Sequence, residues 1–180
     1  MAQKYPALNQ EMTAFIAAQQ LYFVGTAADE GRINVSPKGC DTLRVLSDNR
    51  IVWLNLTGSG NETAAHLLQN DRITMMFCSF AEKPLILRCY GSASISHPRD
   101  ESWSELKALF PDFPTARQIV DMRIDLVQTS CGFGVPFYTY EGERDNMSKW
   151  ASAKGEQGIK DYWAAKNQSS LDGLPTKILD

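Results

Sequence analysis

Hydroxyl and amide side chains crowd one short segment of the sequence, NLTGSGNETAAHLLQN at residues 55–70. An apolar stretch ends there, and a helical pattern begins at once. The first turn of a helix has free backbone N–H donors, which bind phosphate well. Glycines let a backbone approach a ligand closely. The segment therefore predicts a phosphate site formed by Thr57, Gly58, Ser59, Asn61 and Thr63.

The same segment allows a purely structural interpretation. Residues 59–62, Ser-Gly-Asn-Glu, fit the S-x-x-E pattern of a helix capping box. In that arrangement the Ser59 hydroxyl accepts from a backbone N–H near Glu62, and the Glu62 carboxylate reaches back. This interpretation uses Ser59 but leaves the other polar side chains free, so the sequence leaves both open.

A phosphate site also needs a positive charge, and Lys38 is the candidate. It follows Pro37 in the run INVSPKG at residues 33–39. Proline lacks a ladder donor, so this strand is expected to end there or to lie at a sheet edge. In an up-and-down barrel the strand end would lie beside the strand that ends at Thr57. The alternative for Lys38 is a solvated lysine in a turn.

Short apolar runs separated by turns predict the elements that position these residues. Strands are expected at 21–27, 33–39, 43–47, 50–57, 72–80, 85–96 and 117–130, and helices at 8–20, 59–69 and 101–110. In the last strand, Val120, Met122, Ile124 and Leu126 are expected to face inward. This pattern predicts a mostly β (β+α) fold, a barrel of about six antiparallel strands with peripheral helices.

The composition becomes polar and helix-prone after Tyr140. Gly155 and Gly158 interrupt the pattern, which predicts one broken helix or two short helices lying on the barrel. The tail from residue 169 is expected to be loose. We therefore predict a barrel domain at residues 1–140 and a C-terminal helical extension at 141–180.

Composition limits the classes of function. The chain has 180 residues, a net charge of −3 and no run of basic residues, so we expect neither nucleic acid nor an anionic membrane as a partner. No apolar stretch reaches the roughly 18 residues of a membrane span. Four separated cysteines form no CxxC pair, and the two histidines lack metal-ligand spacing. These features predict reduced thiols, no metal site and a cytoplasmic protein.

The order of the motifs resembles the pyridoxamine 5′-phosphate oxidase-like family of FMN-binding split barrels, over roughly residues 5–136. The similarity rests on VSPKG (35–39), VWLNL (52–56), LLQNDRITMMF (67–77) and LRCYGSA (87–93). The resemblance implies a split-barrel homodimer with FMN at the subunit interface. It implies that the turn after residue 56 and Lys38 hold the phosphate, and that Ser36 and Asn55 face the ribityl chain or the flavin edge.

Two later segments are candidates for the flavin wall. Gly132 lies in TSCGFGVPFYTY at residues 129–140, where bare backbone and aromatic rings would cover a flavin from the partner subunit. An aromatic cluster that packs the dimer or the C-terminal helix is the alternative. By the resemblance, Trp150 would stack on the ring.

Departures from the oxidase itself suggest a different substrate. Its Ser-Arg-Lys turn corresponds here to SGNET at residues 59–63, and its C-terminal Arg-Leu-His-type motif has no counterpart. We therefore expect an FMN-dependent oxidoreductase acting on a small molecule other than vitamin B6, with NADH or NADPH as candidate electron donors. No catalytic residue is assigned.

Three alternatives to this function remain. They are a flavin-binding stress or storage protein without turnover, a deazaflavin-dependent reductase, and a haem protein. Haem is disfavoured because His66 is expected on a helix surface and His97 precedes a proline.

Overall fold

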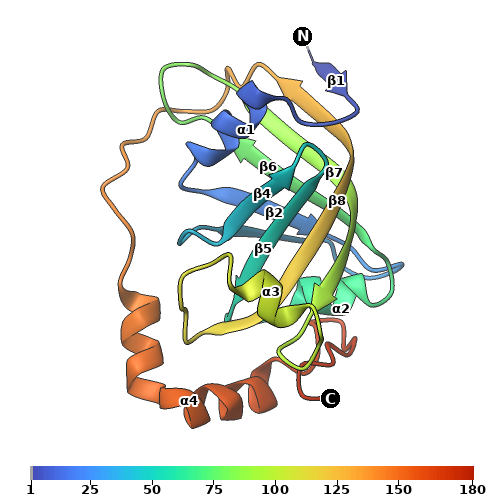
Figure 1. The fold of residues 1–180 in the computed structure, drawn as a ribbon, viewed down its shortest axis with the longest axis vertical. Helices are drawn as coiled ribbons and strands as arrows, with labels where there is room; N and C mark the ends of the chain where they lie inside the picture. Colours follow the sequence, from blue (N-terminus) through green and yellow to red (C-terminus); the bar gives the residue numbers. More distant parts are fainter. Residues whose placement is uncertain (1) are drawn as a thin grey trace.

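One antiparallel sheet organises the computed structural model, which describes residues 2–180. Its strands are β1 (Gln3–Tyr5), β2 (Tyr22–Thr26), β3 (Asn34–Lys38), β4 (Leu43–Ser47), β5 (Arg50–Leu56), β6 (Arg72–Cys78), β7 (Ile86–Ser96) and β8 (Ala116–Ser130). The order is β3-β2-β6-β7-β8-β5-β4, and β1 pairs with β8. The sheet curls into a barrel (Figure 1). Its two edge strands, β3 and β4, do not pair with each other. The predicted split barrel is confirmed, with eight strands rather than about six.

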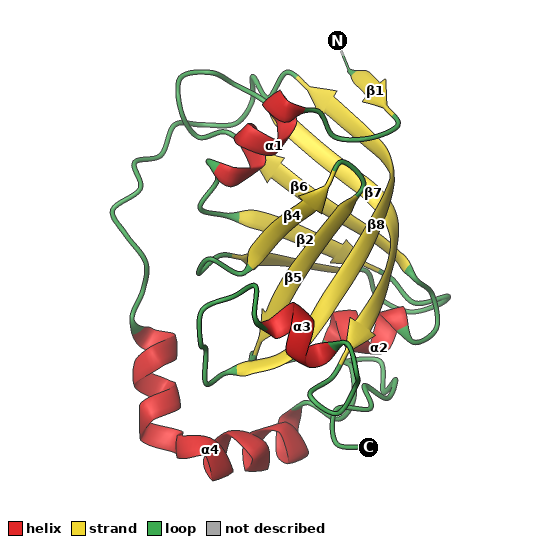
Figure 2. Cartoon of the chain, in the orientation of Figure 1, coloured by secondary structure: helices red, strands yellow, loops and turns green. Residues whose placement is uncertain are grey.

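Four helices surround the sheet (Figure 2): α1 (Gln10–Ala17), α2 (Glu62–Leu67), α3 (Trp103–Lys107) and α4 (Asn146–Lys166). Asn9 caps α1 by accepting from the backbone N–H of Met12 at 2.9 Å. The apolar side of α1 joins the main core, where Trp53 and Phe77 are each 1% exposed. A smaller cluster lies between α3 and the strands β5 and β8. Residues that point to opposite faces of β5 and β8 are therefore both buried.

The predicted inward face of β8 is wrong at Leu126, because the β7–β8 register shifts between Tyr90 and Gly91. Up to Ile124 the alternation holds, with Val120 and Met122 fully buried. Beyond the shift Leu126 is only half-buried and Val127 is buried instead. A bulge adds one residue to one strand, so the side-chain phase reverses there.

The C-terminal segment is more ordered than its composition suggests. Gly155 has φ of +66° and breaks α4 into two pieces, as predicted. The prediction of a loose tail is wrong. Ser169 and Pro175 form a bridge, and Thr176 is fully buried. The division at residue 140 stays a prediction.

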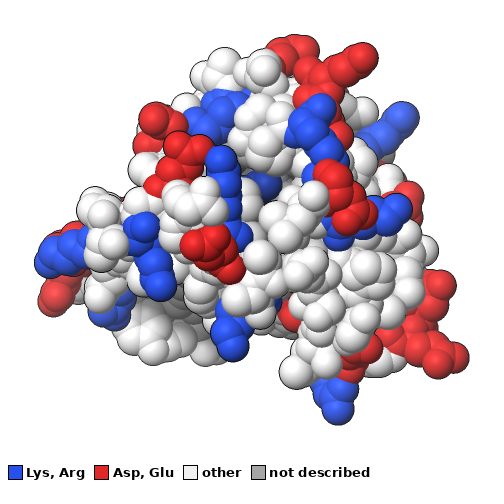
Figure 3. Space-filling view, turned by 90° about the horizontal axis from the view of Figure 1, so that it is seen from below, with Lys and Arg blue, Asp and Glu red and all other residues white. Residues whose placement is uncertain are grey.

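The first half of α4 stands away from the barrel in Figure 1, whereas its second half runs beneath it. Basic and acidic side chains are intermingled on the face seen in Figure 3. No helix within residues 2–180 is long and apolar enough to cross a membrane.

Candidate functional site

A groove of about 840 Å³ lies beside the edge strand β3. β3, the 39–42 turn, the end of β5, the 57–63 turn and the C-terminal segment all line it. Seven of the predicted residues meet there: Ser36, Lys38, Asn55, Thr57, Gly58, Ser59 and Thr63. Small-molecule sites typically have volumes of roughly 300–1,000 Å³. The groove is therefore large enough for a cofactor-sized ligand.

Three other predicted residues do not line this groove. The Asn61 side chain is 1% exposed and donates to the main-chain oxygen of Asn167 at 3.3 Å. Gly132 packs its backbone against Leu85. Trp150 meets Tyr162 edge-on, with ring centroids 5.2 Å apart. Within one chain, Asn61 therefore links the turn before α2 to the C-terminal segment. Gly132 and Trp150 lie outside the groove.

Lys38 is half-buried in β3, and its Nζ lies 4.8 Å from the centroid of the Trp53 ring. Burial, together with the nearby charge of Arg117, lowers the pKa of Lys38 from 10.5 to about 8. The interpretation as a solvated turn lysine is therefore wrong. Its ammonium group is partly desolvated and faces the groove.

Arg117, at the start of β8, is the site residue that the sequence did not reveal. It is 3% exposed and lines the groove. Its Nη1 donates to Asn167 Oδ1 at 2.8 Å, its Nη2 contacts Asn55 Oδ1 at 3.5 Å, and its Nε has no partner. Burial lowers the pKa of Arg117 to about 10.

Strand alternation explains why Arg117 was missed. It shares the parity of Arg123, which is exposed, so alternation alone places both side chains in solvent. The C-terminal segment covers Arg117 instead. No local sequence signal marks Arg117. In the structure the adjacent Gln118 lies directly opposite Asn55 in the β5–β8 register. Two facing buried amides mark a polar site between apolar neighbours.

Four basic residues line the groove: Arg32, Lys38, Arg117 and Lys166. Arg32 is exposed and paired with Asp172, whereas the more buried Lys38 and Arg117 have no acidic partner in the described chain. Within residues 2–180, no ion pair involves Lys38 or Arg117. The groove carboxylate of Glu62 is instead held by the backbone N–H of Leu171, at 3.0 and 3.1 Å. A buried charge is costly unless it is paired. The site therefore has the electrostatic character of an anion-binding site.

The turn before α2 is not a capping box. The N-cap of α2 is Asn61, without a side-chain cap bond, and Glu62 bonds Leu171 rather than reaching back. The hydroxyls of Ser59 and Thr63 make no hydrogen bond within the described chain and line the groove. Because α2 has only six residues, the cations rather than a helix dipole dominate the site.

Thr57 differs from the other two hydroxyl residues. Its Oγ1 donates to the Thr115 carbonyl at 2.9 Å and accepts from Trp163 Nε1 at 2.8 Å. The hydroxyl proton is therefore already used. Thr57 links the turn to α4 and contributes to the wall of the groove rather than a free donor.

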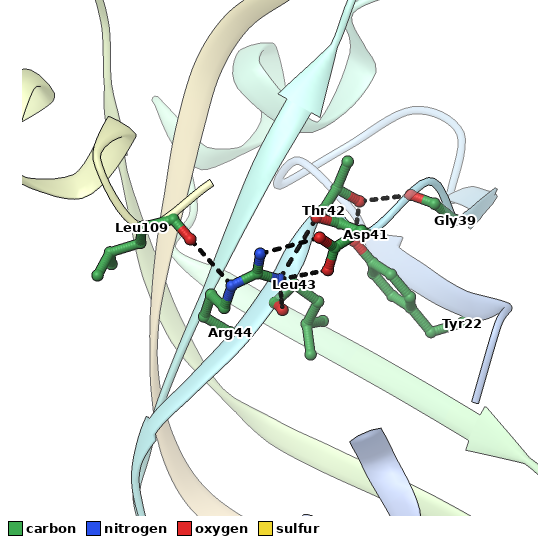
Figure 4. Close-up of polar contacts among 7 residues, drawn as sticks. All are labelled: Tyr22, Gly39, Asp41, Thr42, Leu43, Arg44 and Leu109. Carbon is green, nitrogen blue, oxygen red and sulfur yellow. Dashed lines mark hydrogen bonds and ion pairs between the residues drawn. The ribbon is translucent and has the colours of Figure 1, made fainter. Parts of the chain in front are cut away.

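The 39–42 turn forms a fixed rim (Figure 4). Thr42 Oγ1 donates to the Gly39 carbonyl at 2.7 Å and lies 2.9 Å from Tyr22 Oη, which donates to it. Arg44 binds both carboxylate oxygens of Asp41, at 2.6 and 3.1 Å. Asp41 itself has φ of +53°, an uncommon conformation for a non-glycine residue. These bonds fix the main chain beside Lys38.

Neither histidine lines the groove, whereas Cys40 does. His66 is 1% exposed, with Nδ1 3.1 Å from Thr26 Oγ1, so its predicted place on a helix surface is wrong. All four cysteines are free thiols, and Cys131 is exposed. Within residues 2–180, no three His, Cys, Asp or Glu side chains gather at a distance that would hold a metal ion.

The structure is a split β-barrel with a groove lined by basic side chains. Residues 8–131 match the family model described as pyridoxamine 5′-phosphate oxidase. A pyridoxamine 5′-phosphate oxidase family protein of Aspergillus flavus is 35% identical over 190 residues, covering 95% of this chain and 76% of the relative. The chain therefore belongs to the pyridoxamine 5′-phosphate oxidase family, which confirms the resemblance seen in the sequence.

Solved structures show the same fold at lower identity. HupZ of Group A Streptococcus matches with a TM-score of 0.54 and 21% identity, covering 66% of this chain and 91% of HupZ. The FAD binding protein from Mycobacterium smegmatis matches with a TM-score of 0.50 and 13% identity, covering 69% and 96%. At these identities the likeness concerns the fold alone.

Proposed function

We propose that the groove binds FMN and that the protein is an FMN-dependent oxidoreductase acting on a small molecule other than vitamin B6. The observation that carries this proposal is the pair Lys38 and Arg117, two cations that line one groove without an acidic partner. The family membership supports it, as does a structural neighbour described as FAD-binding.

The groove residues fit a terminal phosphate. Lys38 and Arg117 would balance its two charges, and the Ser59 and Thr63 hydroxyls would donate to its oxygens. The Nε of Arg117 has no partner in the described chain, as expected for a group that awaits an acceptor. A Cβ built on Gly58 would lie 4.0 Å from Arg117 Nη2, so a bare backbone at Gly58 keeps the space beside the guanidinium open.

The remaining groove residues would hold the rest of the cofactor. Ser36 and Asn55 would face the ribityl chain or the flavin edge, and Trp53 supplies an apolar wall beneath Lys38. When bound, the flavin would supply hydride or electron transfer. The chain's own residues would bind it, orient it and exclude water. No side chain is assigned as a general acid or base.

We also propose a homodimer that completes the site. Ile33 and Val35 are 76% and 65% exposed at or beside the edge strand β3, close to the groove. Phe133 and Phe137 are 82% and 77% exposed in the loop before α4. Large exposed apolar side chains are typical of an interface. In the dimer, Gly132 and Trp150 would contact the cofactor of the partner.

The absorbance spectrum of the purified protein, followed by FMN and riboflavin titrations, tests the cofactor. We expect a yellow protein, or one that quenches flavin fluorescence and prefers FMN because only FMN carries the phosphate. A colourless protein that quenches neither flavin would contradict the proposal. Bleaching of the flavin bands by NADH or NADPH would support the oxidoreductase. A bound flavin that no reductant bleaches would instead favour storage without turnover.

A further inference from the structure

A chain of buried polar side chains runs from the groove to a second cleft of the molecule. Arg117 Nη2 contacts Asn55 Oδ1 at 3.5 Å, Asn55 Nδ2 donates to Gln118 Oε1 at 3.2 Å, and Gln118 Nε2 lies 3.3 Å from His97 Nε2. Each of the four side chains is at most 5% exposed. His97 lines the second cleft, whereas Arg117 and Asn55 line the first.

The C-terminal segment holds the Arg117 end of this series of side chains. Asn167 Oδ1 accepts from Arg117 Nη1 at 2.8 Å, and the main-chain oxygen of Asn167 accepts from Thr176 Oγ1 at 2.6 Å. Asn167 and Thr176 are both fully buried. These bonds hold the C-terminal segment against the guanidinium group between β5 and β8.

The Arg117 guanidinium fixes the donor and the acceptor of each hydrogen bond from Arg117 to His97. It can only donate, so Asn55 must present its oxygen to Arg117 and its nitrogen to Gln118. Gln118 must then accept with its oxygen and donate with its nitrogen. His97 Nε2 must therefore be an acceptor, which places the ring proton of neutral His97 on Nδ1.

We propose that Gln118 and His97 are positioning residues of the anion site, and that the two amides transmit the protonation state of His97 to Arg117. A proton on Nε2 would need an acceptor, so Gln118 would turn its oxygen toward His97. Asn55 would follow and would present its N–H₂ group to the guanidinium, donor against donor. Arg117 would lose that bond, and the affinity for a bound phosphate would fall.

Several charged groups surround the His97 ring. The Asp100 carboxylate lies 3.7 Å from Nδ1 and favours the proton, whereas burial and the charge of Arg99 disfavour it. Burial and Arg99 prevail, so the pKa of His97 lies below its usual 6.5. Further charged residues line the same cleft: Arg50, Asp71, Asp121, Arg123 and Lys177. Protonation of His97 is therefore expected below pH 6.5.

Imidazole ¹⁵N NMR of the ligand-free protein tests the direction of these hydrogen bonds without any cofactor. The sequence has only two histidines, so the signals of His97 are assigned by comparison with a His66→Gln variant. We expect neutral His97 to carry its proton on Nδ1 and to accept at Nε2. A proton on Nε2 of the neutral ring would overturn the proposal.

Flavin affinity across pH tests the coupling, which rests on the proposed FMN site. Between pH 7 and 5 the preference for FMN over riboflavin should fall more steeply in the unchanged protein than in His97→Gln, whose amide turns without titrating. The ionisation of the phosphate, near pH 6, is common to both proteins and cancels in this comparison. His66→Gln serves as the matched control and should behave like the unchanged protein.

A second variant tests the role of Gln118 at neutral pH. Gln118→Leu should reduce FMN affinity about tenfold at neutral pH, since one buried hydrogen-bonding position is lost, and should change riboflavin affinity less. Identical pH curves for the unchanged protein and His97→Gln would overturn the coupling alone. Equal affinity of the unchanged protein for FMN and riboflavin would instead overturn the proposed FMN site. The NMR result would still show which nitrogen of neutral His97 carries the proton.

Discussion

The two clefts of the molecule balance their charges in opposite ways. In the second cleft, of about 910 Å³, Arg50 pairs with Asp121 at 2.7 Å, and that bond raises the pKa of Arg50. In the groove, Lys38 and Arg117 have no acidic partner, and burial lowers both pKa values. Both clefts contain charged side chains and are similar in volume. They differ in that Arg50 has a carboxylate partner, whereas Lys38 and Arg117 have none within residues 2–180.

This difference separates an exposed, paired cation from two desolvated cations without an acidic partner. An exposed ion pair contributes little to stability and calls for no partner. Two partly desolvated cations side by side lower stability, and a protein tolerates such a cost mainly where function needs it. The groove is therefore the place where a bound anion would stabilise the fold.

The largest effect is expected from Arg117→Met. Two charge-assisted hydrogen bonds of about 1.5 kcal/mol or more each would be lost, which corresponds to at least about a 100-fold loss of FMN affinity. Arg50→Met, in the second cleft, is the matched control and should leave FMN affinity unchanged. Calorimetric titration measures both variants. An equal loss of FMN affinity in both variants would contradict the assignment of the FMN site to the groove.

A smaller loss is expected from Lys38→Met. One charge-assisted contact of about 1.5–3 kcal/mol corresponds to roughly a 10- to 150-fold loss of FMN affinity, with little change for riboflavin. Because a partly desolvated charge is removed, the melting temperature without ligand should stay the same or rise. Thermal unfolding with and without FMN checks both parts. A clear drop in the ligand-free melting temperature would show that Lys38 stabilises the fold.

The pH dependence of FMN affinity follows from the lowered pKa of Lys38, about 8. Below pH 8 Lys38 of the ligand-free protein is protonated. A bound phosphate would raise the pKa of Lys38 above 8. FMN affinity should therefore be constant from about pH 7 to 8 and fall up to tenfold per unit above pH 8, until the pKa of the complex is reached. Lys38→Met should abolish this alkaline loss. A loss of the same slope in the variant would assign it to another group.

Val35→Lys tests the proposed dimer and should have the smallest effect on the isolated groove. Val35 is 65% exposed on β3, so a lysine there costs the single chain little. Buried in an interface, the new charge would weaken association. Sedimentation equilibrium should show a dimer that dissociates in the variant, whereas Leu171→Lys, at another exposed apolar position, should not alter it. A monomer in both proteins would refute the proposed dimer.

The sequence predicts the barrel better than it predicts the groove. Hairpins and alternation are local signals, so the strands from Tyr22 to Ser96 lie close to their predicted ranges. The pairing of β1 with β8 joins residues far apart in the chain, and no local pattern reveals it. The bulge at Asp125 of β8, between the partners of Tyr90 and Gly91, reverses the side-chain phase without a change of composition.

Within the site, local polar residues were predictable and tertiary partners were not. Ser59 and Thr63 were identified because they cluster in one turn, and Lys38 because it follows a proline at a strand end. Arg117 is buried only because Asn167, fifty residues away, covers it. Such burial depends on the path of the C-terminal segment, which its polar composition does not specify.

A crystal structure of the protein grown with FMN tests the central claim most directly. The account predicts the phosphate within hydrogen-bond distance of Lys38 Nζ and the Arg117 guanidinium, with the Ser59 and Thr63 hydroxyls donating to its oxygens. A groove filled only by water, or a phosphate held elsewhere while both cations stay unpaired, would contradict it.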